Sequence, residues 1–176
     1  MRLLKLSVAC SLDGFLEGPD GAIDWIRRDA DYGMGAFLAS LDTVLIGRRT
    51  FEMARRSGNK FFSAMTNYVF SKSLPAGVSD DVEIIGEDAV DFVRGLKASR
   101  TGKGLWLFGG RELIGSMLRG RLVDEIYLTV HPVILGGGLP LFGSLAERQD
   151  LKLADAKPLK NGVVMLSYRV DGGQAH

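Results

Sequence analysis

The chain has 176 residues, of which 46% are hydrophobic, and a formal net charge of +1. This length and composition fit one globular domain, which we expect to cover residues 1–170, with a frayed tail over 171–176. The near-neutral charge gives no reason to expect nucleic acid or an acidic membrane surface as a partner. A single cysteine, Cys10, excludes an internal disulfide, and His131 and His176 lack ligand neighbours at zinc spacing, so we expect no metal.

The first expected strand covers residues 3–11. Its second face carries only small side chains near the end, at Ser7, Ala9 and Ser11. Such a face either accommodates a packed helix or leaves space for a flat ring against the backbone. Because Lys5 interrupts this short apolar run, the run is neither a signal peptide nor a membrane span, and we expect a cytoplasmic protein.

A turn at Asp13-Gly14 follows the strand, and residues 17–22 form a polar loop with glycine and proline. This loop is either a mobile flap over a site or a surface loop. Beyond Trp25, apolar residues at helical spacing between positions 34 and 41 predict a helix.

Asp29 or Asp31 lies near the start of this helix, and Asp31 faces its apolar side more directly than Asp29 does. Asp31 precedes Met34 and Leu38 at helical spacing, so we expect its carboxylate on the buried side. One interpretation is a cap or a favourable charge in the first helical turn. The other is a carboxyl group in an apolar crevice, whose raised pKa would suit a general acid.

A buried strand over residues 43–47 leads to a short helix over 51–56, which Thr50 can cap. The pattern then predicts three more strands and one more helix. These are strands over residues 68–70, 82–85 and 126–131, with a possible extension of the last over 132–135, and a helix over residues 88–97.

The central junction joins a buried strand over residues 105–108 to a helix over 111–119 through Gly109 and Gly110. Paired glycines let another molecule approach the main chain, and the free N–H groups of a helix start attract phosphate. A tight turn without a ligand is the alternative. The junction at Gly47 is of the same kind, and strand ends in an open sheet line one crevice, so both junctions could grip one diphosphate.

Residues 151–157 and 163–170 alternate as strands and predict an antiparallel hairpin about residues 160–162. The chain thus contains eight expected strands interleaved with four helices, mostly in β–α order. This order predicts an α/β fold with a mostly parallel sheet.

Basic residues follow two of the strand ends, at Arg48, Arg49 and Lys72. Taken singly, each is an ordinary solvated side chain, but their shared position suggests that they converge beyond the diphosphate. Cations at that place favour a phosphate on the adenosine ribose, whereas an acidic residue would favour a free hydroxyl. This pattern indicates NADPH rather than NADH.

Four segments in succession, residues 11–14 (SLDG), 46–51 (IGRRTF), 108–110 (FGG) and 126–129 (IYLT), resemble the dihydrofolate reductase-like fold family. The resemblance is closer to its bacterial branch related to the reductase (C-terminal) domain of the bifunctional riboflavin biosynthesis deaminase/reductase. It covers almost the whole chain. It implies a homodimer with a three-layer α/β fold: a mixed, mostly parallel eight-stranded sheet with helices on both faces and a C-terminal antiparallel hairpin.

The same resemblance implies an NADPH-dependent reductase that transfers a hydride to a small heterocyclic substrate. The implied coenzyme contacts are Ala9, Leu16, Gly47, Arg48, Arg49, Thr50, Ser71, Lys72, Gly109, Gly110, Arg111 and Glu112. The implied catalytic or substrate-side residues are Asp31, Asp13 and Thr129. Within the first set, the backbone of Ala9 would meet the nicotinamide carboxamide, and Leu16 would cover the ring.

The chain departs from the folate enzymes at one interval. Those enzymes place Leu-Pro-Gly-Arg before the third strand, whereas residues 57–62 here carry no arginine, and Lys60 offers only a point charge. The resemblance therefore favours an activity of the 5-amino-6-(5-phosphoribosylamino)uracil reductase type. The alternatives are a dihydrofolate or pterin reductase and, from another class, a non-catalytic nucleotide-binding module.

Overall fold

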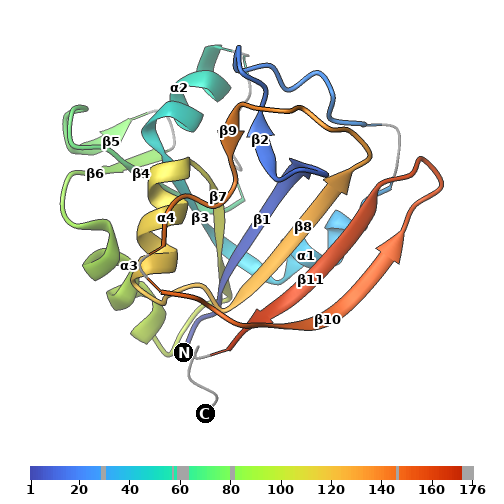
Figure 1. Cartoon of the computed structure of the whole chain (residues 1–176). Coiled ribbons are helices and arrows are strands. Elements are labelled where there is room, and N and C mark those ends of the chain that lie inside the picture. The colour runs from blue at the N-terminus through green and yellow to red at the C-terminus, as the bar shows by residue number, and fades with distance from the viewer. Residues whose placement is uncertain (29–30, 57, 59–63, 80–81, 146, 172–176) are drawn as a thin grey trace.

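A computed structural model describes residues 1–28, 31–56, 58, 64–79, 82–145 and 147–171 of the chain (Figure 1). The expectations that concern Asp29, Lys60 with most of the interval 57–62, and the tail from residue 172 to His176 lie outside these residues. Asp171, the first residue of the expected tail, still donates its backbone N–H to Asp150 O at 2.9 Å.

One large sheet organises the described part of the molecule. Its nine strands are β1 (Leu4–Ser11), β3 (Leu41–Gly47), β4 (Thr66–Phe70), β5 (Gly77–Ser79), β6 (Val82–Ile85), β7 (Gly104–Gly109), β8 (Glu125–His131), β10 (Leu151–Pro158) and β11 (Val164–Val170). Their order across the sheet is β10-β11-β8-β1-β7-β3-β4-β6-β5. All eight expected strands are present, and the mixed, mostly parallel sheet and the C-terminal hairpin are confirmed.

The sequence pattern missed three short strands. β5 pairs antiparallel with β6 at the sheet edge, while β2 (Phe15–Glu17) and β9 (Leu139–Pro140) form a separate two-stranded sheet. Strands of two or three residues are too short for side-chain alternation to reveal, because long-range backbone pairing alone defines them. Residues 132–135 do not extend β8, which ends at His131.

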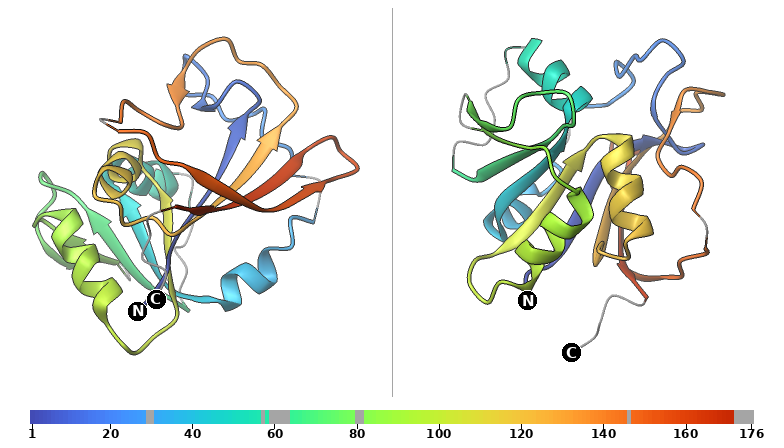
Figure 2. Two further views of the ribbon diagram at one scale, coloured as in Figure 1. Left: turned by 60° about the horizontal axis from the view of Figure 1, so that its bottom comes forward. Right: turned by 90° about the vertical axis from the view of Figure 1, so that its left-hand side faces the viewer.

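Helices cover both faces of the sheet, which confirms the three-layer architecture (Figures 1 and 2). They are α1 (Met34–Ala39), α2 (Arg48–Arg56), α3 (Ala89–Ala98) and α4 (Arg111–Arg119). One core cluster joins α3 and α4 to leucines of β1 and β7, such as Leu6 and Leu107. The other joins residues of α1 and α2 to Val44 and Trp106 on the opposite face.

Two helix starts differ from expectation. α1 begins at Met34 rather than after Trp25: the described residues 26–28 and 31–33 are not helical, and Gly33, directly before the helix, has a left-handed φ of 62°. α2 begins at Arg48, directly after β3, so Thr50 lies inside its first turn and does not cap it. Leu41, expected on the first helix, opens β3 instead and is buried.

The parallel pairing places the carboxyl ends of six strands along one side of the sheet, which we call the strand-end edge. Each pair of neighbours in this group is parallel, and the group runs in the order β8, β1, β7, β3, β4 and β6. The glycine junctions after β3 and β7 therefore open at the same edge of the sheet, as the predicted crevice requires. Among the described residues, no helix is long and apolar enough to cross a lipid bilayer.

Candidate functional site

The two glycine turns that follow β3 and β7 touch each other. A Cβ atom built on Gly110 would lie 2.8 Å from the Cα of Gly47, and one built on Gly47 would lie 3.0 Å from the Cα of Gly110. Gly110 also has a φ of 100°, which side-chain-bearing residues rarely adopt. Only glycine at both positions lets the two backbones approach this closely.

Two helix N-termini begin at this contact. α2 starts at Arg48 and α4 at Arg111, so each presents the free N–H groups of its first turn. Thr50 in the first turn of α2 lies against Gly109, since a Cβ there would be 3.4 Å from the Thr50 Cγ2. The structure thus brings two of the predicted coenzyme segments, 47–50 and 109–112, to one place.

A third predicted segment follows the next strand along the edge. Phe70 pairs with Gly47 across β3 and β4, and Ser71 and Lys72 come directly after it. Ser71 is buried, and its hydroxyl accepts the backbone N–H of Leu74 at 3.0 Å, which shapes the turn. Lys72, like Arg48, is exposed at this end of the edge.

At the other end of the edge, Ala9 on β1 pairs with Thr129 on β8. From β1 through β7 and β3 to β4, the strand ends span three interstrand spacings, roughly 14 Å at the usual distance of about 4.8 Å. An extended ligand along this edge would therefore contact Ala9, both glycine turns and Ser71 in order.

A cavity of about 360 Å³ lies on the sheet face that α1 covers. It is lined by residues of β1, α1, β8, β10 and β11, among them Lys5, Ser7, Tyr32, Phe37, Tyr127 and Thr129. One wall is apolar, where Phe37 stands edge-on to Tyr127 with ring centroids 5.1 Å apart. A small flat molecule with a polar rim fits such a cavity.

The polar groups at the cavity floor satisfy one another. Tyr127 donates its hydroxyl to Glu125 at 2.8 Å, and Lys5 lies 3.3 Å from the same carboxylate. Burial, followed by the hydrogen bond and charge of Glu125, raises the pKa of Tyr127 to about 12. Tyr127 therefore stays protonated and engaged at neutral pH. Among the described residues that line the cavity, the only carboxylate is Asp155 on β10.

Asp31 does not project into this cavity, contrary to the expected buried side. It is exposed, and its Oδ1 accepts the backbone N–H of Gly33 at 2.8 Å. The helix starts later than the spacing suggested, so the arithmetic that placed Asp31 over Met34 and Leu38 does not apply. Its neighbours Tyr32 and Gly33 line the cavity, whereas Asp31 is not among the lining residues.

Asp13 holds two loops together. Its carboxylate accepts the hydroxyl of Ser11 at 2.6 Å and the backbone N–H groups of Leu135 and Gly136 at 3.1 and 2.8 Å. The Ser11 hydroxyl lowers the pKa of Asp13 most strongly. Burial opposes it, but the Gly136 and Leu135 amides also act in the lowering direction, so the pKa lies below its ordinary value. The side chain joins the end of β1 to the loop after β8.

Asp13→Ala is expected to lower the melting temperature, with an effect that depends on pH. A carboxyl group with a depressed pKa stabilises the fold above its unfolded-state pKa, and this contribution is lost as the pH falls through the folded-state value. The melting-temperature difference from the wild type should thus shrink below about pH 4. Calorimetry across pH checks this, with the exposed Asp24→Ala as the control, and a difference that stays constant with pH would contradict it.

Leu16, expected in a flap over the nicotinamide ring, lies in β2. It is half-buried and packs against the core on the α3 and α4 side. β2 is tied to β9 so closely that a Cβ on Gly138 would lie 2.0 Å from the Glu17 carbonyl oxygen. Residues 17–22 close on themselves through Gly18 N–H to Ala22 O at 2.9 Å.

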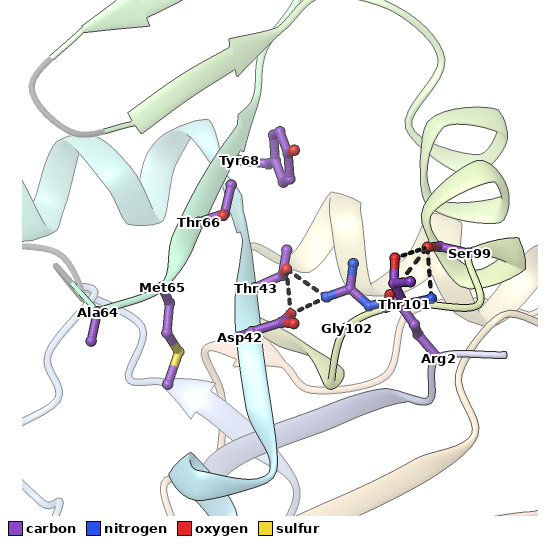
Figure 3. A pocket seen from close by; sticks show the side chains of 10 residues that line it. All are labelled: Arg2, Asp42, Thr43, Ala64, Met65, Thr66, Tyr68, Ser99, Thr101 and Gly102. Atoms are coloured by element: carbon purple, nitrogen blue, oxygen red, sulfur yellow. Dashed lines mark hydrogen bonds and ion pairs between the residues drawn. The ribbon is translucent and has the colours of Figure 1, made fainter.

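A larger hollow, of about 650 Å³, lies at the opposite edge of the sheet (Figure 3). Arg2 crosses it and donates to Asp42, to Thr43 Oγ1 at 2.7 Å and to the Lys103 carbonyl at 2.7 Å. Burial alone would raise the pKa of Asp42, but hydrogen bonds from Lys103 and Thr43 and the charge of Arg2 outweigh it, so the pKa is lowered. These charges neutralise each other at the amino ends of the strands, far from the glycine turns, and the hollow is not our candidate site.

His131 is the residue that sequence reasoning missed, because it considered this side chain only as a metal ligand. It ends β8 two residues after Thr129, so strand periodicity places both on the same face, and this was the available signal. The ring is 1% exposed and accepts the Arg27 N–H on Nδ1 at 3.2 Å. Burial, together with the charge of Arg27, lowers its pKa.

Comparison with known proteins identifies the family. Residues 2–165 match the family model of the RibD C-terminal domain. The chain belongs to this family. It is 34% identical over 183 residues to YyaP, an uncharacterized protein of Bacillus subtilis, with 97% of this chain and 96% of YyaP covered.

Solved structures agree with this membership. A putative riboflavin biosynthesis protein from Shewanella sp. PV-4 superimposes with a TM-score of 0.84 at 25% identity, covering 97% and 99% of the two chains. Dihydrofolate reductase from Enterococcus faecalis, solved with NADP(H), superimposes with a TM-score of 0.70 at 16% identity, covering 96% of each chain, which shows the fold alone. The family and the fold together support a reductase.

Proposed function

We propose that this chain is an NADPH-dependent reductase of a small heterocycle, of the 5-amino-6-(5-phosphoribosylamino)uracil reductase type. The observation that carries the proposal is the contact between the Gly47 and Gly110 turns, where a side chain would fill the space beside two helix N-termini. Family membership supports the substrate type, and the NADP(H) bound to the Enterococcus enzyme supports the coenzyme.

The residues of the strand-end edge fit a dinucleotide phosphate. The first turns of α2 and α4 would hold the diphosphate, because helix N-termini offer free N–H groups and a favourable dipole. Arg48, Arg49 and Lys72 would bind the phosphate of the adenosine ribose, and the backbone of Ala9 would orient the carboxamide. When bound, NADPH supplies a hydride from C4 of its nicotinamide.

The cavity beneath α1 would hold the substrate beside β1. Phe37 and Met34 exclude water from one face of the ring, and the Thr129 hydroxyl hydrogen-bonds to its polar edge. Holding two reactants in contact lowers the barrier by removing the entropy of their encounter. A proton is also needed, and either Asp31, which precedes the lining residue Tyr32, or an ordered water would supply it.

Substrate-dependent oxidation of NADPH, followed by its absorbance with purified protein, tests this function. The assay compares ribosylaminopyrimidine and pterin candidates, and turnover with a pterin alone would favour the dihydrofolate or pterin reductase. Saturating NADPH should also raise the free energy of unfolding by about 2.7 kcal/mol at roughly 100 times its Kd. Such stabilisation without any turnover would indicate a nucleotide-binding module. If NADPH produces neither turnover nor stabilisation, the glycine turns are purely structural.

Asp31→Asn distinguishes the two proton sources: a fall in turnover of roughly 100-fold with unchanged NADPH binding would assign proton delivery to Asp31. The exposed Asp24→Asn serves as the control. Unchanged turnover would restrict Asp31 to its hydrogen bond with Gly33 N–H and would assign proton delivery to water.

A second copy of the chain remains the predicted macromolecular partner. β10 lies at one edge of the large sheet and is exposed along its whole length, which leaves room for a homodimer contact. A monomeric mass by light scattering at working concentration would contradict the homodimer.

A further inference from the structure

We propose that His131 is a positioning residue, which holds Tyr32 as a wall of the substrate cavity by means of the Arg27 backbone. The consequence for catalysis rests on the proposed reductase function, whereas the contacts themselves do not. The inference starts from a buried imidazole that the reductase chemistry outlined above leaves unused.

The contacts form a chain from the strand to the cavity. His131 Nδ1 accepts the Arg27 N–H at 3.2 Å, and the Arg27 carbonyl accepts the Tyr32 hydroxyl. Tyr32 in turn lines the cavity together with Thr129. A change at His131 therefore reaches the cavity wall through one residue.

Ring packing keeps the imidazole in this place. Trp25 stands edge-on to His131 with ring centroids 5.4 Å apart and an interplanar angle of 79°, and Tyr32 lies at 6.4 Å. The His131 side chain is only 1% exposed. Segments far apart in sequence thus meet at one side chain, which fixes where residues 25–28 and Tyr32 lie above the sheet.

The hydrogen bond determines the protonation state of the ring. Because Nδ1 accepts the Arg27 N–H, it carries no proton, and the neutral imidazole has its proton on Nε2. Nε2 is buried and has no hydrogen-bond partner among the described residues. A second proton would go onto Nδ1, where it would face the Arg27 N–H and break the bond.

The surrounding charges oppose protonation too. Arg27 contributes a positive charge that disfavours the imidazolium, and burial acts in the same direction. On β1, the neighbour of His131 is Ser11, whose hydroxyl donates to the Asp13 carboxylate. The contact is therefore complete above the ordinary histidine pKa of about 6.5 and is lost as the pH falls through the lowered pKa of the folded protein. The cavity wall should loosen over the same range.

Two substitutions separate the hydrogen bond from the packing. His131→Phe keeps an aromatic ring between Trp25 and Tyr32 but removes the acceptor for the Arg27 N–H. His131→Asn places an amide oxygen near the Nδ1 position and does not titrate. For His131→Phe we expect faster exchange of the Arg27 amide hydrogen and a substrate KM raised about tenfold, as expected for loss of one buried hydrogen bond. Its kcat and NADPH affinity should stay within about twofold of the wild-type values, because neither the glycine turns nor the reacting groups are touched.

His131→Asn should keep wild-type protection of the Arg27 amide and wild-type KM at about pH 8. It should lack the loss of protection, measured against the intrinsic exchange rate at each pH, and the rise in KM that we expect for the wild type as the pH falls through the lowered pKa of His131. Amide exchange by mass spectrometry needs no substrate, so it tests the contact even if no reductase activity is found. Wild-type protection of the Arg27 amide in His131→Phe would overturn the inference, and so would faster exchange with an unchanged KM. If His131→Phe fails to fold, equal pH dependence of the wild type and His131→Asn would overturn it instead.

Discussion

Gly110→Ala is expected to abolish NADPH binding and to lower the free energy of unfolding by roughly 2–5 kcal/mol. A residue with a Cβ at positive φ costs about 1–2 kcal/mol, and overpacking adds about 1–3 kcal/mol. Gly110 has a φ of 100°, and its Cβ would meet Gly47 backbone atoms, Cα at 2.8 Å and N at 3.2 Å. These atoms belong to the end of β3 and cannot move aside as a flexible side chain would.

Chemical denaturation and calorimetric titration with NADPH measure the two effects of Gly110→Ala. Gly77→Ala on β5 is the matched control, since Gly77 has a φ of 135° but nothing within 4 Å of a built Cβ. It should cost about 1–2 kcal/mol for the positive φ alone and leave NADPH binding intact. Gly47 has no positive φ, so Gly47→Ala measures the cost of the steric contact alone. NADPH binding by Gly110→Ala at wild-type affinity would remove the coenzyme assignment of these turns.

Arg48→Ala combined with Lys72→Ala is expected to weaken NADPH binding by about 100-fold or more and NADH binding by less than about threefold. Charge-assisted hydrogen bonds to phosphate are worth about 1.5–3 kcal/mol each, and only NADPH carries the ribose phosphate. The two side chains follow Gly47 and Phe70, which pair in adjacent strands. In the absence of coenzyme, Arg48 pairs with Glu52 at 2.9 Å, an exposed contact that it can leave at little cost.

Parallel titrations with NADPH and NADH check this prediction. Arg94→Ala, an exposed cation on α3 that pairs with Asp91 at 2.6 Å, controls for loss of surface charge. Equal losses for the two coenzymes would show that the cations do not read the ribose phosphate, and the preference for NADPH would then have no structural basis.

Two corrections around the candidate site concern where a helix begins. Helical spacing placed Asp31 on a buried face, but α1 starts only at Met34, after Gly33 with its left-handed φ. Thr50 looked like a cap, but α2 starts as soon as β3 ends. Spacing indicates which side chains share a helix face, but it does not decide at which residue the helix begins.

Side-chain patterns predicted the eight main strands, the helices over residues 88–97 and 111–119 to within a residue or two, and the glycine junctions at Gly47 and Gly109. These features are local, since side-chain periodicity and glycine content act within a few neighbours. The order of the strands could be learned only from the folded molecule: β7 lies beside β3, which brings Gly47 against Gly110, and Asp13 bonds to residues 135 and 136. The fold also buries His131 beneath Trp25. Such contacts join residues far apart in the chain and depend on strand order, which is fixed by the joint burial of whole faces and is not encoded in any one segment.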